Sequence, residues 1–199
     1  EYALKRHFLF NAQLYSNEHF FLAGPAVGAP MATLCVEKLI ALGARRIVVY
    51  GWCGAIHPDL RIGDVYLPVS GLSEEGTSQH YCTQGPWDPS VHASLMTALV
   101  RAGRQPKSGP IWTTDALYRE TRQKVEQYAL QGILAVDMEY TALRAVAAFR
   151  AVALGAVMLV SDELFGDQWT PGYSRKQFRS HSRQTLALLV SFLHTAMLE

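Results

Sequence analysis

Two acidic motifs stand out in this sequence because each directly follows a short run of apolar residues. Residues 137–139 (DME) come after Ile133–Val136, and residues 161–163 (SDE) come after Val152–Val160. Apolar runs of this length are typical of buried parallel strands. Both motifs are therefore expected at the carboxyl ends of strands, which is the edge where ligands bind in α/β sheets.

Carboxylates at such an edge have two chemical uses. Glu139 or Asp162 can accept two hydrogen bonds from a vicinal diol such as that of a ribose. A carboxyl whose pKa is raised by burial can also act as a general acid. Structural roles compete with both uses, because Glu139 suits the positive end of a helix dipole and Asp162 can cap a loop. Spacing alone leaves both interpretations open.

A third feature is the stretch Arg46–Asp64, in which a β-branched strand over Ile47–Tyr50 is followed by Gly51 and Gly54. Glycines beyond the end of a strand allow backbone N–H groups to approach a ligand closely. A lone Gly-x-x-Gly is weak support for a binding loop, and on the glycines alone a plain turn is the simpler interpretation.

The elements that position these residues alternate between strands and helices. A strand over His19–Ala23, a helix from Pro30 to Gly43 and a strand from Arg46 predict a βαβ unit, hence a parallel sheet. The order continues as β-α-β-α-β-α-β-α, which ends in an amphipathic helix over Arg175–Leu198. A long polar stretch, Ser70–Pro86, is expected to form a loop. We predict one α/β domain over residues 1–199, with helices on both faces of a mostly parallel sheet.

Composition excludes several classes of function. The 199 residues carry a formal charge of +1 with no Lys/Arg cluster, so neither nucleic acid nor an anionic membrane is expected as a partner. The most apolar window, Val152–Val160, is too short to span a bilayer. Cys35, Cys53 and Cys82 are odd in number and widely spaced, which argues against a disulfide framework or a zinc site. We expect a cytoplasmic protein with no metal and no cofactor.

Several motifs together resemble those of the nucleoside phosphorylase family, which includes purine nucleoside phosphorylase, uridine phosphorylase and the methylthioadenosine/adenosylhomocysteine nucleosidases. The resemblance covers nearly the whole chain, and the two acidic motifs are its most specific parts. It implies a three-layer αβα fold around a twisted, barrel-like sheet, and cleavage of an N-glycosidic bond to ribose. The motifs are Gly24–Pro30, GWCGAI at 51–56, IGDVYLP at 62–68, EEGTSQHY at 74–81, TTDALY at 113–118, VDMEYTAL at 136–143 and VSDEL at 160–164.

The resemblance gives the acidic motifs specific roles. It implies that Glu139 binds the ribose hydroxyls and favours the positively charged transition state. Met138 would pack against the sugar, with Asp137 beside it in place of a more usual Glu. Asp162, preceded by Ser161 as in the purine enzymes, would protonate N7 so that the base leaves as a neutral molecule.

The same resemblance indicates which residues would contact or select the base. Leu117 and Tyr118 fall where the base-flanking aromatics lie, although Leu117 departs from the commoner Phe. Arg175 falls where bacterial purine phosphorylases place an arginine beside the acid, in less similar surroundings. Thr121 and Gln123 stand where uridine-specific members carry a Gln and an Arg. A purine is therefore favoured over a pyrimidine, although EEGTSQHY is closer to the uridine-type branch.

The resemblance leaves phosphate use open. Arg6 aligns with an arginine that family phosphorylases donate to a neighbouring subunit's phosphate site. A second phosphate-binding arginine and the Ser or Thr near it are replaced by Val49 and Trp52, and Val offers no donor to a dianion. The region for phosphate or water would thus comprise Arg6 and residues 51–54, namely Gly51, Trp52, Cys53 and Gly54.

Three functional hypotheses follow. Phosphorolysis of a purine nucleoside, with inorganic phosphate as co-substrate, is favoured by Arg6. Hydrolysis, as in the nucleosidases, is favoured by Val49 and Trp52. A nucleoside-binding homologue without catalysis is the third, because the chain also starts after the point where the family has its first strand and phosphate loop. A shared Arg6 implies a homo-oligomer, a dimer or a trimer of dimers, with sites at subunit interfaces.

Overall fold

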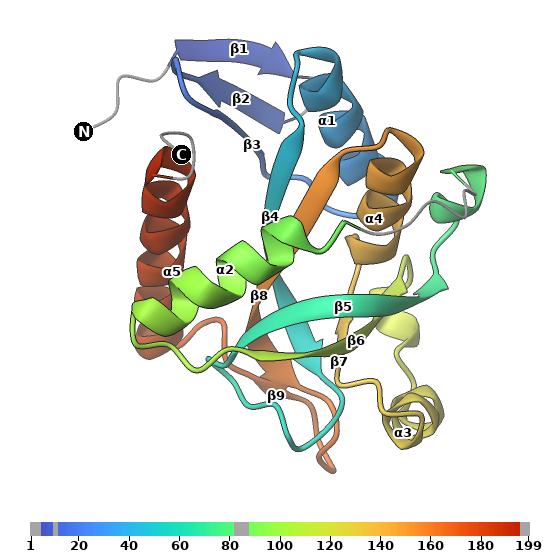
Figure 1. The fold of residues 1–199 in the computed structure, drawn as a ribbon. Coiled ribbons are helices and arrows are strands. Elements are labelled where there is room, and N and C mark those ends of the chain that lie inside the picture. Colours follow the sequence, from blue (N-terminus) through green and yellow to red (C-terminus); the bar gives the residue numbers. More distant parts are fainter. Residues whose placement is uncertain (1–4, 10–11, 82–87, 196–199) are drawn as a thin grey trace.

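The computed structural model describes residues 5–9, 12–81 and 88–195 of the chain, and the fold comprises two sheets and five α-helices within these ranges (Figure 1). The first sheet is small and antiparallel. It consists of β1 (Lys5–Leu9), β2 (Ala12–Ser16) and β3 (Phe21–Gly24) in that order. The predicted βαβ unit is wrong, because β3 pairs antiparallel with β2 and does not enter the main sheet.

The main sheet is closed into a five-stranded barrel. Its strands run in the order β4-β7-β6-β5-β8, and β8 pairs back onto β4. The long pairings, β4 with β8 and β5 with β6, are parallel, as is the shorter pairing of β6 with β7, whereas β4–β7 and β5–β8 are short antiparallel contacts. The barrel strands are β4 (Arg46–Ala55), β5 (Val65–Glu74), β6 (Lys107–Thr114), β7 (Ala135–Asp137) and β8 (Ala153–Glu163), and the short β9 (Thr170–Pro171) adds to β8.

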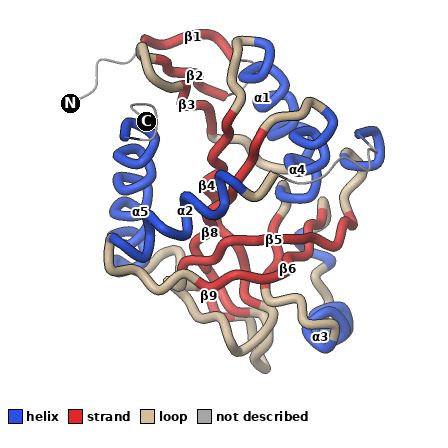
Figure 2. Tube along the Cα trace, viewed as in Figure 1, coloured by secondary structure: helices blue, strands red, loops and turns tan. Residues whose placement is uncertain are grey.

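Helices cover the barrel on two sides, which confirms the predicted three-layer αβα arrangement with a mostly parallel, barrel-like sheet (Figures 1 and 2). On one side, α1 (Ala29–Ala41) and α4 (Tyr140–Phe149) pack on the strands. On the other side lie α2 (Ser90–Arg101) and α5 (Lys176–Thr195). The shorter α3 (Arg122–Leu130) packs against a separate apolar cluster at one end of the barrel.

The spacing of apolar residues explains how the helices dock. In α2, Val91, Leu95 and Leu99 recur every four residues and are buried against β8, while the intervening residues are half-buried or exposed. Burying each leucine contributes about 1.5–3 kcal/mol. In α4, Leu143, Val146 and Ala147, three and four residues apart, are buried on the opposite side of the barrel. The predicted helices are confirmed because their apolar faces are regular.

Strand ends are where the structure departs from the sequence-based expectation. The strand expected to end at Tyr50 continues as β4 to Ala55, because its whole length pairs with β8. Likewise β5 runs on to Glu74 along β6, and a 3₁₀ turn, η1 (Ser78–Tyr81), follows, so the predicted loop begins later than Ser70. Residues 82–87 of that stretch, including Cys82, lie outside the described residues. Within the described ranges, no helix is both long and apolar enough to cross a membrane.

Candidate active site

Gly54, near the end of β4, is the point where the strands that carry the two acidic motifs meet. It pairs with Val136 on β7 and with Asp162 on β8. A Cβ at this position would lie 2.5 Å from Leu164 Cδ1 and 3.3 Å from Asp162 Oδ2, so only glycine fits without displacing a neighbour. The predicted turn glycine is therefore a strand residue whose missing side chain lets the motifs approach.

A β-bulge sets the direction of the second motif. Cys53 pairs with Val160, yet the next residue, Gly54, pairs with Asp162, so Ser161 is an extra residue in β8. Bulges of this kind redirect side chains and are common beside active sites. The Ser161 hydroxyl lies 3.2 Å from the Cys53 carbonyl oxygen and 2.6 Å from Asp162 Oδ1.

Cys53 lies between the two motifs and reports their proximity. Its side chain is buried, and burial raises the pKa of the thiol well above its usual value. The negative charges of Asp137 and Asp162 raise this pKa further. Such a thiol stays protonated and is not a nucleophile at neutral pH.

Asp137 is turned into the protein. Its side chain is only 5% exposed, and Thr113 Oγ1 donates to Oδ1 at 2.6 Å. Oδ2 accepts from the backbone N–H groups of Tyr140 (2.7 Å) and Glu139 (3.2 Å), so Asp137 caps the start of α4. Burial is the largest influence and raises the pKa of Asp137 to about 7, against these hydrogen bonds. Both oxygens are thus occupied by the protein, and ribose contact by Asp137 stays a prediction.

Glu139 is held from the other side of the site. The backbone N–H of Gly28, at the N-terminus of α1, donates to Glu139 Oε1 at 2.6 Å. Gly28 has φ +84°, a conformation that favours glycine and aims this N–H at the carboxylate. Burial raises the pKa of Glu139, whereas the Gly28 and Met138 backbone hydrogen bonds oppose the rise. Because Gly28 anchors Oε1, the carboxylate has a fixed orientation in which Oε2 can serve a ligand.

Asp162 has a partner that its motif does not reveal. The indole N–H of Trp169, on the segment between β8 and β9, donates to Oδ2 at 2.7 Å. Arg175, predicted to stand beside Asp162, is exposed and makes no side-chain contact with it among the described residues. Its predicted role therefore stays a prediction, and in this structure Trp169 occupies the position next to the acid.

The predicted base-flanking residues lie on a 3₁₀ turn, η2 (Leu117–Arg119), after β6. The side chain of Leu117 is 50% exposed and that of Tyr118 is 98% exposed. Neither packs into the core, so both are free to meet a ligand from solvent.

Trp52 points away from the acidic motifs. Its ring packs edge-on against Phe178 of α5, with 5.1 Å between ring centroids. Cys53 belongs to the core cluster on the α1/α4 side, and Val49 packs against the same cluster. Since neighbouring strand residues face opposite ways, Trp52 does not fill the space beside Cys53. Trp52 therefore leaves this space open, whereas Val49 still offers no donor to a phosphate dianion.

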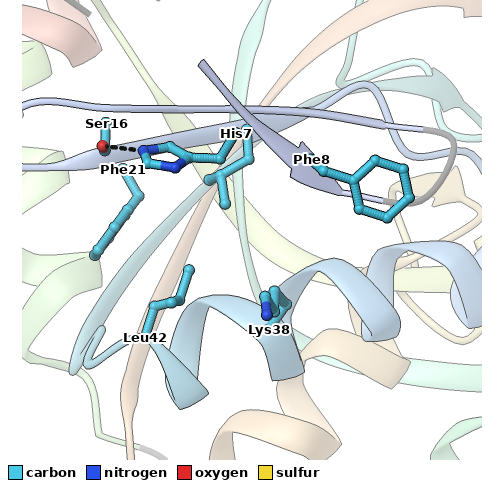
Figure 3. A pocket seen from close by; sticks show the side chains of 7 residues that line it. His7, Phe8, Ser16, Phe21, Lys38 and Leu42 are labelled. Carbon is cyan, nitrogen blue, oxygen red and sulfur yellow. Dashed lines mark hydrogen bonds between the residues drawn. The ribbon is translucent and has the colours of Figure 1, made fainter. Parts of the chain in front are cut away.

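A separate cavity of about 340 Å³ lies between the N-terminal sheet and α1 (Figure 3). His7 from β1 points to Ser16, whose hydroxyl lies 2.7 Å from its Nε2. None of the predicted site residues lines this cavity, but Arg6 precedes His7 on the exposed strand β1. The lining residues are His7, Phe8, Leu14, Ser16, Phe21, Lys38 and Leu42.

Comparison with known proteins identifies the family. A profile of the phosphorylase superfamily matches residues 3–194. The chain belongs to the phosphorylase superfamily. It is 28% identical over 167 residues to DeoD-type purine nucleoside phosphorylases of Bacillus cereus and Bacillus thuringiensis, covering 81% of this chain and 71% of theirs. The crystal structure of purine nucleoside phosphorylase from Toxoplasma gondii in complex with immucillin-H superimposes with a TM-score of 0.86 at 19% identity, over 98% of this chain and 83% of that one.

Membership of the phosphorylase superfamily confirms the family and the fold inferred from the sequence motifs. The structure adds three contacts that the motifs did not reveal, one made by Gly28 within the Gly24–Pro30 motif and two by residues outside the motifs. Gly28 contacts Glu139, Trp169 contacts Asp162, and Glu120 is close enough for the charge of Asp162 to act on it. Gly28 and Glu120 are distant in sequence from the carboxylates they approach, and Trp169 reaches Asp162 only through the path of a loop. The spacing of residues in the sequence therefore could not reveal these contacts.

Metal chemistry has no support in the described part of the chain. No three His, Cys, Asp or Glu side chains there converge on one point that could hold an ion. The site instead offers carboxylates from both motifs, Asp162 paired with Gly54 and Glu139 bound by the Gly28 N–H. The arrangement suits binding of a diol and protonation of a leaving group.

Proposed function

We propose that this member of the phosphorylase superfamily cleaves the N-glycosidic bond of a purine nucleoside by phosphorolysis. The observation that carries the proposal is the convergence of the two acidic motifs around Gly54 and Cys53. The names of the DeoD-type relatives favour a purine base. The reaction needs no cofactor, with inorganic phosphate as the second substrate.

The ribose side of the proposed reaction belongs to Glu139 and Met138. With Oε1 held by Gly28, Oε2 of Glu139 can accept hydrogen bonds from the 2′- and 3′-hydroxyls. As the glycosidic bond breaks, C1′ becomes positive, and the fixed negative charge of Glu139 stabilises that charge more than it stabilises the ground state. Asp137 supports this geometry by capping the helix that follows Glu139.

The base side belongs to Asp162. Its carboxyl would deliver a proton to N7, so that the electron pair of the broken bond ends on a neutral base. Ser161 and Trp169 fix the two oxygens of Asp162. Leu117 and Tyr118 would close over the base from η2, and Arg175 would approach Asp162 when the nucleoside is bound.

Hydrolysis is the second candidate, and Val49 is the observation that favours it. Val49 packs against the same apolar cluster as Cys53, so the site lacks a cation where family phosphorylases place one. Phosphorolysis would then depend on Arg6 from a neighbouring copy, whose strand β1 is exposed. Hydrolysis does not require such a cation, because the attacking water molecule is neutral.

An assay of base release separates these candidates. We would incubate the protein with inosine, adenosine, methylthioadenosine and uridine, each with and without phosphate, and measure free base and ribose 1-phosphate. Phosphorolysis predicts purine release that depends on phosphate and yields ribose 1-phosphate. Release that phosphate does not change would establish hydrolysis, and calorimetric binding without any release would establish a non-catalytic homologue.

The proposal includes a cytoplasmic homo-oligomer with shared sites, and the composition and Arg6 support it. The described cysteines, Cys35 and Cys53, are free thiols, as a reducing compartment requires. Phe8, two residues after Arg6, is 83% exposed beside the cavity of Figure 3, as expected for a strand that a second copy covers. Light scattering that gives a monomer at assay concentrations would refute shared sites.

A further inference from the structure

The motif EEGTSQHY at 74–81 is attached to α4, although the proposed reaction uses none of its residues. Near its start, Glu75 accepts a hydrogen bond from the Thr141 hydroxyl, in the first turn of α4, at 3.1 Å. At its end, Tyr81 packs edge-on against Phe149, the last residue of that helix, with 5.6 Å between ring centroids. The motif is thus fastened to both ends of the helix that follows the ribose-binding motif.

Glu75 is a buried carboxylate surrounded by hydrogen-bond donors, and it is 8% exposed. Besides Thr141, the Ser73 hydroxyl donates to Oε1 at 2.9 Å. On the other oxygen, Oε2 accepts from the backbone N–H groups of Thr77 and Ser78. Burial raises the pKa of Glu75, but these hydrogen bonds together outweigh burial and lower it. Glu75 is therefore ionised at neutral pH and can only accept, so the Thr141 hydroxyl must donate to it.

Thr141 is fixed by three separate contacts. Its hydroxyl donates to Glu75, and its backbone N–H donates to Thr113 Oγ1 at 3.2 Å. Its methyl group packs against β5 at Gly71, where a Cβ would lie only 2.5 Å from Thr141 Cγ2. Thr113 itself donates to Asp137, in the ribose-binding motif. The first turn of α4 is therefore held by β5, by β6 and by the turn that follows β5.

Glu139 directly precedes this fixed turn of α4. Its carbonyl oxygen accepts from the Leu143 N–H at 3.1 Å, and its backbone N–H donates to Asp137. Its side chain reaches across to α1, where the Gly28 N–H donates to Oε1. Hydrogen bonds to a carboxylate depend steeply on angle, so a small rotation of the first turn of α4 would turn Oε2 away from a bound diol.

We propose that Glu75 is a positioning residue for the ribose. Through Thr141 it fixes the first turn of α4, and thereby the direction in which Glu139 presents Oε2 to the 2′- and 3′-hydroxyls. An ionised carboxylate suits this role because one buried anion binds donors from the turn and from the helix at once, and so joins them. The inference rests on the proposed function and gives the motif at 74–81 a part in substrate binding.

Thr141→Val breaks the proposed link selectively, because valine keeps the branched shape that packs on Gly71 and lacks the hydroxyl. Thr141→Ser is the matched control, because it keeps the hydroxyl and loses only the methyl group. The two substrates are inosine and 2′,3′-dideoxyinosine, which lacks both hydroxyls that Glu139 would bind. We expect Thr141→Val to lower kcat/KM for inosine by about tenfold and for dideoxyinosine by less than about twofold. Thr141→Ser should stay within roughly threefold of wild type for both substrates.

The ratio of the two kcat/KM values decides the test, because a merely structural role of Thr141 would lower both alike. An equal loss with inosine and dideoxyinosine in Thr141→Val, or no loss with either, would overturn the proposal. A change of the ratio that is as large in Thr141→Ser would also overturn it, because the hydroxyl would then not be the link.

Hydrogen exchange of the Gly28 amide measures the positioning without any substrate. This N–H is bonded to Glu139, so Thr141→Val should accelerate its exchange by about tenfold, whereas Thr141→Ser should leave it unchanged. An unchanged Gly28 rate in Thr141→Val would refute the positioning role even if nucleosides are cleaved. A faster rate in a protein that cleaves no nucleoside would retain the positioning contact and refute the proposed function alone.

Discussion

Asp137 offers a quantitative test of the site, because its carboxyl is buried and is used inside the protein. In the folded protein its pKa is about 7, against an ordinary value of 3.8, a difference of about 3 units. At 1.36 kcal/mol per unit, ionisation of Asp137 in the folded state costs about 4 kcal/mol relative to ionisation in the unfolded chain. The pKa of Asp137 is higher in the folded protein than in the unfolded chain. The contribution of the protonated carboxyl to the free energy of unfolding is therefore fully present below pH 3.8 and is lost as pH rises through 7.

Asp137→Asn removes this titration and nearly preserves the shape. The amide oxygen can accept from the Tyr140 and Glu139 N–H groups, and the amide N–H₂ can donate to Thr113 Oγ1, whose hydroxyl then loses its acceptor. That loss costs about 1–3 kcal/mol and does not depend on pH. Between pH 5 and pH 8 the stability difference should therefore shift by about 2–3 kcal/mol in favour of the variant.

Urea unfolding of wild type and Asp137→Asn at pH 5, 6, 7 and 8 measures this shift through the midpoint and slope of each transition. Asp167→Asn is the control, because Asp167 is fully exposed and its difference from wild type should stay within about 0.5 kcal/mol at every pH. A stability difference for Asp137→Asn that is the same at pH 5 and pH 8 would refute a raised pKa. If Asp137 only caps α4, the nucleoside KM of the variant should stay within roughly threefold, and a larger rise would instead support ribose contact.

Three further substitutions test the contacts of the site. Gly54→Ala places a Cβ 2.5 Å from Leu164 Cδ1, so we expect a loss of about 1–3 kcal/mol in urea unfolding, and no loss would contradict the close packing of β4 and β8. Trp169→Phe removes the indole N–H that fixes Asp162 Oδ2, so kcat for a purine nucleoside should fall by roughly threefold to tenfold with little change in KM, and an unchanged kcat would exclude this positioning role. Glu139→Gln keeps the shape and loses the charge, so kcat/KM should fall by about 10²–10³-fold with an unchanged melting temperature, whereas full activity would remove Glu139 from the proposed mechanism.

The acidic motifs could be located from the sequence because local rules place them. Asp137 and Asp162 each follow an apolar strand, and helices with regular apolar spacing, such as α2 and α4, follow from the same kind of pattern. What the pattern could not give was the length of the strands. Gly51 and Gly54 interrupt the apolar run of β4, yet pairing with β8 extends that strand to Ala55. Tertiary pairing decides strand ends, and a single sequence does not contain it.

The contacts of the carboxylates were beyond sequence analysis for a related reason. Gly28 meets Glu139 across 111 residues, and Trp169 turns back onto Asp162 through a loop whose path is fixed by Arg122. Glu120 has no motif and is notable only because burial and Asp162 act on it together. Such features arise from how the closed barrel folds its connections together and are visible only in three dimensions.

Barrel closure also explains why the acidic motifs act as one unit. In an open sheet, the strands that carry Asp137 and Asp162 would be neighbours only if the strand order happened to place them side by side. Here β4 pairs with both β7 and β8, so Gly54 contacts both strands, and the charges of Asp137 and Asp162 both raise the pKa of Cys53. A change that separates β8 from β4 must displace Asp162 relative to Asp137 and Glu139 at once. Substitutions at Gly54 and in either motif should consequently be non-additive, since they perturb one shared junction.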